Sequence, residues 1–216
     1  QELAKGAVIF HGLLPKVGCR EASGAMEKIR SSKAIRFFGS RQGKHKIFWV
    51  RVPGYFCQFL IDPPMARPES GGPLRMRGEV NKICFDDSST RNVIHAILNS
   101  STYYQFFCAY TDTRHINPSD VTEFPLDLTA FDSAIKAKLS KLSTRLAECF
   151  GSHTTQSRKS GLLVDSVDSR PSKPILDEID QVLAQHYGFT AEELDFVINY
   201  DTKYRLGREA EIEEQQ

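Results

Sequence analysis

The chain has 216 residues, of which 40% are hydrophobic and 25% charged, which is ordinary for a soluble protein with a full-sized core. No apolar run approaches the ~20 residues that a membrane helix needs, and no signal-peptide pattern opens the chain. Five scattered cysteines without CxxC spacing argue against a disulfide framework and a zinc site, and they fit a cytoplasmic location. Because the first residue is Gln1, we expect a piece of a longer polypeptide.

The net charge of +1 conceals an uneven distribution. Residues 1–170 carry 24 Lys and Arg against 16 Asp and Glu, whereas residues 171–216 carry 4 against 11. Residues 28–51 hold eight basic residues, His45 and no carboxylate. A block of one sign is typical of a surface that binds a polyanion, although a solvated basic face would have the same composition.

The first half of the chain predicts a small sheet. Residues 1–34 form a connecting segment, with a possible strand at 7–14 and a possible helix at 22–32. The β-branched and aromatic runs 46–52 and 55–62, joined at Pro53-Gly54, predict an antiparallel hairpin. Four Pro and three Gly predict a loop at 63–78, and a third strand follows at 80–85.

Helices dominate the second half. Capping side chains at 87–90 predict a helix at 91–98, and Asn99-Ser100-Ser101 permits a bend before an aromatic helix that ends near residue 111. Asn117 and Pro118 begin a short helix, and an apolar stripe predicts an amphipathic one at 128–150. Residues 151–170 are polar and predict a mobile loop or linker, before helices at 173–187 and 191–199. The fold class is therefore α+β: a small, twisted, mainly antiparallel sheet closed by helices, followed by a C-terminal helical region.

Two segments resemble parts of one enzyme family. Residues 97–126, ILNSSTYYQFFCAYTDTRHINPSDVTEFPL, resemble the region that closes the target-recognition domain of adenine-specific DNA methyltransferases. Residues 172–207, SKPILDEIDQVLAQHYGFTAEELDFVINYDTKYRLG, look like the closing segment of type IIG restriction-modification enzymes. The resemblance implies a DNA target-recognition domain at 35–127, like those of type I specificity subunits. It also implies a helical region at 128–216 that braces this domain against a methyltransferase core.

The same resemblance implies the partners. These are double-stranded DNA and the methyltransferase domain of the same parent chain, with no membrane. The chain would hold the duplex and read bases for that catalytic domain, which is absent here. S-adenosylmethionine would bind in the parent methyltransferase domain, and this chain would hold no cofactor.

Basic residues in three places are candidates for DNA contact. The loop and strand start Arg41-Gln42-Gly43-Lys44-His45-Lys46 is the first, because Arg and Gln can read base edges while Lys and His hold phosphates. The alternative is a basic hairpin tip without a ligand. The full set is Arg36, Arg41, Gln42, Lys44, His45 and Lys46 in the basic block, Arg67, Arg75 and Arg77 on the Pro/Gly loop, and Arg114 and His115 at a corner.

That corner also has a structural interpretation, in which Asn117 caps a helix and Arg114 contacts Asp112 or Asp120. The aromatic run 103–110 is expected to be core rather than a platform for bases. His95 is expected to be a satisfied residue at the edge of the core.

No catalytic pattern is complete. Asp62-Pro63-Pro64-Met65 follows a strand, as the Asn- or Asp-Pro-Pro-aromatic motif of adenine methyltransferases does, but Met65 replaces the aromatic ring and no Gly-rich cofactor loop precedes it. A turn that closes the hairpin is the better interpretation. The six histidines form no metal-binding motif, so no metal is expected. Two other hypotheses remain: a protein-interaction module that docks through its acidic C-terminal helices, and a divergent methyltransferase built around Asp62.

Overall fold

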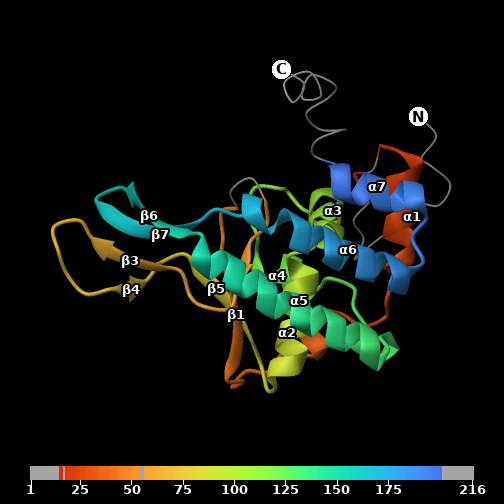
Figure 1. The fold of residues 1–216 in the computed structure, drawn as a ribbon, viewed down its shortest axis with the longest axis horizontal. Helices are drawn as coiled ribbons and strands as arrows, with labels where there is room; N and C mark the ends of the chain where they lie inside the picture. The colour runs from red at the N-terminus through yellow and green to blue at the C-terminus, as the bar shows by residue number, and fades with distance from the viewer. Residues whose placement is uncertain (1–14, 17, 54–55, 201–216) are drawn as a thin grey trace.

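A computed structural model describes residues 15–16, 18–53 and 56–200. The described part has α+β architecture, with two antiparallel sheets and seven α-helices. Figure 1 shows a helical body from which an arm of four strands projects to one side. The strand expected at 7–14 lies outside the described residues.

The body sheet has three strands, in the order β2-β1-β5. The central strand β1 (His45–Val50) pairs antiparallel with β2 (Phe59–Leu60) on one side and β5 (Val80–Phe85) on the other. The expected hairpin and the strand at 80–85 are confirmed. The strand expected at 55–62 is only two residues long. The backbone of Phe59 also bonds to the side chain of Asn99, the C-cap of helix α2 (Ser88–Leu98): its N–H donates to Asn99 Oδ1 at 3.1 Å, and its carbonyl accepts from Asn99 Nδ2 at 3.1 Å.

The arm consists of two hairpins that pair with each other. Its strands are β3 (Met65–Pro68), β4 (Arg75–Met76), β6 (Thr154–Lys159) and β7 (Leu162–Val167), in the order β4-β3-β7-β6. The loop expected at 63–78 is therefore a hairpin with a loop only at its tip, which corrects the prediction.

The linker expected at 151–170 is likewise a hairpin. Ser160 and Gly161 adopt φ values of 51° and 75°, which is the geometry of the tight two-residue turn that suits hairpins. Every residue of β6 is exposed, so the strand has none of the apolar alternation by which strands are recognised in sequences. Its polar composition was misread as a linker for that reason.

Helices form the rest of the body. The α-helices are α1 (Arg20–Lys28), α2 (Ser88–Leu98), α3 (Ser101–Tyr110), α4 (Pro118–Thr122), α5 (Ser133–Ser152), α6 (Lys173–Tyr187) and α7 (Ala191–Asn199), with 3-10 turns η1 (Ile35–Phe37), η2 (Leu128–Ala130) and η3 (Arg170–Ser172). The helices expected at 173–187 and 191–199 are confirmed. Helix α5 begins later than expected because the Asp132 side chain accepts from the Ile135 N–H and caps the helix there.

The core is aromatic where α3 meets the body sheet. Tyr103 is fully buried, with its ring centroid 5.3 Å from those of both Phe59 and Phe124. Trp49 of β1 is buried as well and donates from Nε1 to the Ile116 carbonyl at 3.0 Å. The aromatic run is thus core, as predicted. The core cluster includes residues from Ala22 to Val197, and the domain boundaries at 34 and 127 remain predictions.

A buried carboxylate joins the two segments that carry the family resemblance. Ser100 caps α3 by accepting from the Tyr103 N–H at 3.1 Å. Asp180 of α6 is fully buried and accepts from the N–H groups of Ser101 and Thr102, at 2.9 Å and 3.0 Å. The bend between α2 and α3 is therefore held by a side chain 78 residues further along the chain.

Candidate nucleic-acid interface

The loop before β1 presents three predicted contact residues to solvent. Arg41, Gln42 and Lys44 are all exposed. Gly43 between them is buried, and a Cβ there would lie 2.3 Å from the Phe85 carbonyl oxygen. Only glycine allows this close approach, so the backbone at Gly43 is fixed against Phe85. The side chains of Arg41, Gln42 and Lys44 remain exposed to solvent. His45 and Lys46 follow on β1 and are partly buried.

Carboxylates from distant parts of the chain pair with three of the four basic residues in the first half of the basic block. Lys28 pairs with Glu193 at 2.6 Å, Lys33 with Asp127 at 3.1 Å, and Arg36 with Glu123. The Arg36 guanidinium also lies over the Phe37 ring. Residues 28–51 are therefore not one continuous basic surface, and Arg36 serves the packing of η1 against the end of α4.

The arm gathers five basic side chains from two hairpins. Register places Arg67 and Arg158 on one face of its sheet, because both lie opposite Leu163. Arg75 and Lys159 belong to the other face, with Arg77 just beyond β4. Arg67 donates to Gln156 at 3.4 Å, and Arg158 lies 3.7 Å from Glu69 with 83% of its side chain exposed. Contacts so long and exposed neutralise little charge.

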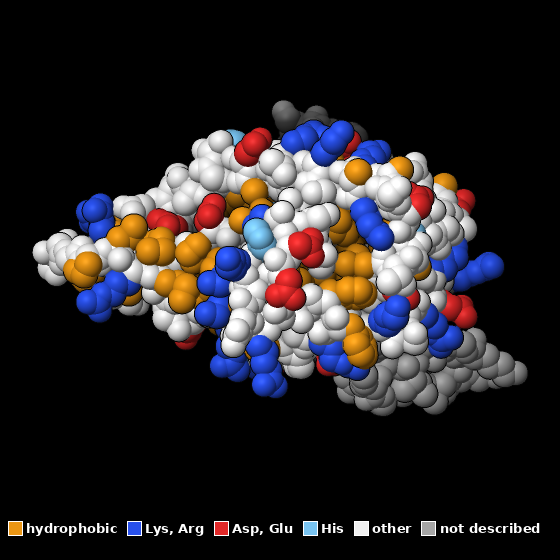
Figure 2. Space-filling view, turned by 90° about the horizontal axis from the view of Figure 1, so that it is seen from below, with side chains coloured by type: hydrophobic (Ala, Val, Ile, Leu, Met, Phe, Trp, Pro, Cys, Tyr) orange, Lys and Arg blue, Asp and Glu red, His pale blue; other side chains and the backbone are white. Residues whose placement is uncertain are grey.

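A groove of about 680 Å³ follows the second face of the arm. Its floor includes Ala66, Val164 and Leu162, and the segment 71–79 forms one side. Leu74, Met76 and Leu162 are among the exposed large apolar side chains of the described residues. Figure 2 shows apolar side chains exposed along the arm, with basic side chains beside them.

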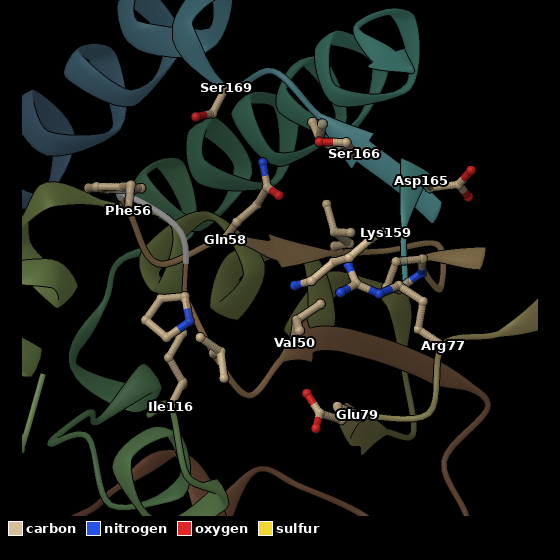
Figure 3. Close-up of a pocket in the computed structure, with 15 residues that line it drawn as sticks. Val50, Phe56, Gln58, Arg77, Glu79, Ile116, Lys159, Asp165, Ser166 and Ser169 are labelled. Atoms are coloured by element: carbon tan, nitrogen blue, oxygen red, sulfur yellow. The ribbon is translucent and has the colours of Figure 1, made fainter. Parts of the chain in front are cut away.

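A second cavity of about 400 Å³ lies at the base of the arm. It shares Arg77, Glu79 and Lys159 with the groove, so the two are contiguous. Figure 3 shows the Arg77 and Lys159 side chains extending over Val50 of β1, with Gln58 opposite. We call this cavity the arm-base cleft.

The corner that carries Arg114 and His115 borders the arm-base cleft. The Asp112 carboxylate accepts from the backbone N–H groups of Arg114 and His115, at 2.9 Å and 3.0 Å, and these bonds lower the pKa of Asp112. The neighbouring residue Ile116 lines the cleft and donates its N–H to the Arg51 carbonyl at 2.8 Å.

The structural interpretation of the corner is confirmed for Asn117, which is the N-cap of α4. Asp120 accepts from the Asn117 N–H at 2.8 Å. Arg114 contacts Asp112 through its backbone, and its guanidinium forms no ion pair among the described residues. That side chain therefore stays exposed beside the arm-base cleft.

The predicted residues thus form two groups at opposite ends of β1. The loop 41–44 lies at the end where His45 faces Phe85, and the base of the arm lies at the end where Val50 faces Val80. Five residue steps of an extended strand separate the two ends by about 17 Å. The corner at 114–115 belongs with the arm.

Sequence reasoning missed Gln58, Arg158, Lys159, Ser166 and Ser169. Four of these lie in the segment assigned to a linker, and Gln58 lay within an expected strand. The dipeptide Ser160-Gly161 was the available signal, because Ser-Gly marks turns.

The remaining candidates for chemistry in the described residues are metal-binding groups and the Asp62 motif. No group of three His, Cys, Asp or Glu there could hold a metal ion. Asp62-Pro63-Pro64 connects β2 to β3, so it leads from the body into the arm rather than closing the hairpin. None of the described helices is long and apolar enough to cross a membrane.

No protein-family model, curated protein or solved structure matches this chain.

Proposed function

We propose that this chain is the DNA-sequence-recognition module of an adenine-specific DNA methyltransferase or combined restriction-modification enzyme. It holds the duplex and reads bases for a catalytic domain elsewhere in the parent chain, where S-adenosylmethionine binds. The observation that carries the DNA-binding part is the projecting arm, whose Arg75, Arg77 and Lys159 have no ion-pair partner among the described residues. The adenine specificity and the type of parent enzyme rest on the resemblance of residues 97–126 and 172–207.

The shape of the arm suits double-stranded DNA. The major groove of B-DNA is about 12 Å wide and admits a two-stranded β-ribbon. Each hairpin of the arm is such a ribbon, and both carry arginines on exposed positions. The loop with Arg41 and Gln42, at the other end of β1, supplies a second contact with the same duplex. Arg and Gln side chains read guanine and adenine edges, while Lys44 and Lys159 hold phosphates.

The alternative, a protein-interaction module that docks through acidic C-terminal helices, has less support from the described residues. Their carboxylates are largely occupied within the chain: Asp177 pairs with Lys173, Glu178 with Arg145 and Glu193 with Lys28. Asp180 of α6 is buried against the start of α3. The described parts of α6 and α7 therefore offer a partner little free negative charge.

Site choice in the parent enzyme tests the proposal. Changing Arg41 or Gln42 to Ala is expected to relax one position of the methylated sequence, because a bidentate base contact contributes ~1–3 kcal/mol of discrimination. Changing Lys44 or Lys46 is expected to weaken binding to all sequences alike, since phosphates carry no base information.

Sequencing of methylated sites measures both effects. If Arg75→Ala or Arg77→Ala alters the site while Arg41→Ala and Gln42→Ala do not, base reading belongs to the arm and the assignment to the loop is wrong. If none of the variants changes methylation, the proposal fails. Titration of the isolated chain with S-adenosylmethionine distinguishes the divergent-methyltransferase hypothesis from the proposed function, because only that hypothesis predicts that the chain itself binds S-adenosylmethionine.

A further inference from the structure

The arm-base cleft is a cavity rather than a flat surface. A phosphate on a duplex is held by side chains on an open surface, whereas this half-open cavity has a volume of about 400 Å³ between the body sheet and the arm. That volume lies in the range of sites for small molecules, about 300–1,000 Å³. The cleft therefore has room for a group that enters it.

Two cations lie together at the mouth of the cleft. Arg77 follows β4 and Lys159 ends β6, both line the cleft, and in the view of Figure 3 both side chains extend over Val50. Neither forms an ion pair with a carboxylate within the described residues. Two like charges held in one place without a counter-charge favour an anion between them.

The two carboxylates that line the cleft do not supply this counter-charge. Asp165 accepts from the Met65 N–H at 2.9 Å, and in Figure 3 its carboxylate points away from Lys159. Glu79 is exposed and lies on the other side of Val50 from the two cations in the same view. The anion position is thus open.

Behind the cations, the wall combines one amide with apolar surface. Gln58 points into the cleft between Phe56 and Lys159. An amide offers a donor and an acceptor side by side, as the polar edge of a nucleobase does. Val50, Leu60 and Val167 add apolar walls on which the faces of a base can lie, and Ser166 and Ser169 add hydroxyl groups.

We propose that the arm-base cleft binds a single nucleotide that is not stacked in a duplex. Its phosphate lies between Arg77 and Lys159, and its base lies inside, beside Gln58. This inference rests on the proposed DNA-binding function, which it extends from a grip on paired DNA to recognition of one unpaired nucleotide. The same chemistry would accept a free nucleotide, so the test distinguishes the two sources.

The test uses the full chain and three probes. These are a fully paired duplex, the same duplex with one bulged nucleotide, and free deoxynucleoside monophosphates. Fluorescence anisotropy with labelled duplexes is expected to show at least about tenfold tighter binding to the bulged duplex.

Lys159→Gln and Gln58→Ala are expected to abolish this preference, and Lys159→Arg to keep it. Lys141→Gln, on the exposed side of α5, is the control and should leave it unchanged. Thermal unfolding confirms that each variant is folded.

Each outcome decides between the two claims. If the native chain binds bulged and paired duplexes equally well, the inference is wrong and duplex binding stands. If a free monophosphate displaces the bulged duplex at comparable concentrations, and this depends on Lys159, the ligand is the free nucleotide. If neither duplex binds but a monophosphate does so through Lys159, the cleft is a nucleotide site and the proposed function fails. Absence of binding to all three probes overturns both the nucleotide site and the proposed DNA-binding function.

Discussion

His95 illustrates how single buried residues hold this fold together. It is fully buried on α2, with Nε2 3.1 Å from the Phe59 carbonyl and Nδ1 2.9 Å from Ser143 Oγ. A carbonyl can only accept, so Nε2 carries the proton and Nδ1 accepts from the Ser143 hydroxyl. His95 is thus hydrogen-bonded through both ring nitrogens, as the sequence predicted, and it lies inside the core rather than at its edge, where it joins β2 to α5. Burial lowers the pKa of His95 to about 3.

This pKa sets a direction for stability against pH. In the unfolded chain the imidazole takes a proton near pH 6.5, whereas in the native state it does so only near pH 3. The unfolded state therefore binds more protons between these values. The contribution of neutral His95 is fully present above about pH 6.5 and is lost as the pH falls, by about 1.4 kcal/mol per unit.

Urea unfolding at pH 7, 5.5 and 4 measures this effect when the native chain is compared with His95→Gln. The difference in free energy of unfolding between the native chain and His95→Gln should shrink as the pH falls, because the variant lacks the imidazole that titrates. Parallel curves for the two proteins would show that His95 does not titrate as its burial requires.

Asp180 is the second residue with a large expected effect. Its pKa is raised by burial, against the hydrogen bonds from Ser101 and Thr102 that favour the carboxylate. Asp180→Ala would leave two buried N–H groups without partners, at about 1–3 kcal/mol each. Asp180→Asn keeps an acceptor and should cost less.

Asp177→Ala is the matched control on the same helix, since Asp177 forms a half-exposed pair with Lys173. Such pairs contribute at most about 1 kcal/mol. Equilibrium unfolding in urea should therefore rank the variants Asp180→Ala, Asp180→Asn and Asp177→Ala, from the largest loss to the smallest. An Asp180→Ala variant as stable as Asp177→Ala would mean that Asp180 does not hold the bend.

At the scale of elements, the loop before β1 depends on one close backbone approach. Gly43→Ala would force a Cβ into the Phe85 backbone, whereas at Gly39 the nearest atom to an added Cβ is a side-chain carbon of Ile83 at 3.4 Å. We expect Gly43→Ala to destabilise the pairing of β1 with β5 and to displace Arg41, Gln42 and Lys44. Gly39→Ala in the same loop should cost little.

Hydrogen exchange of the β5 amides measures this difference. Faster exchange in Gly43→Ala than in Gly39→Ala is the expected result. Equal protection in the two variants would mean that the loop is not fixed by its contact with Phe85.

Elements with local signals were predictable and those without were not. Helix α7 begins at a capping box in which Thr190 and Glu193 bond reciprocally, and both residues are visible in the sequence. Strand β5 has three β-branched or aromatic residues, Val80, Ile83 and Phe85, among its six. Strand β6 exists because it pairs with β7, which in turn pairs with β3 nearly 100 residues earlier. No local pattern contains that information.

The same limit applied to the candidate interface. The residues of the loop at 41–46 and of the Pro/Gly segment were identified from their side-chain chemistry and from the glycines and prolines around them. Lys159 was overlooked because its hairpin was not recognised. Arg36 was included among the DNA-contact candidates because its partner Glu123 lies 87 residues further along the chain. A count of charges within one segment does not detect such a pair.

For the whole molecule, folding redistributes the charge that the sequence displays. The basic block loses Lys28, Lys33 and Arg36 to carboxylates of α7, η2 and α4. Among the basic residues without such partners are those of the loop at one end of β1 and of the arm at the other. We propose that these two places form one electrostatic footprint on duplex DNA.

The salt dependence of duplex DNA binding by this chain tests that claim most directly. If four phosphates are neutralised, the association constant should fall about 100-fold between ~50 and ~200 mM salt, because the bound counterions are released. Replacing Arg41 and Lys44 together with Gln should reduce the slope, and so should replacing Arg75 and Lys159, while Lys141→Gln should not. An affinity that stays flat across this salt range, or a slope that none of these pairs of changes reduces, would contradict the account.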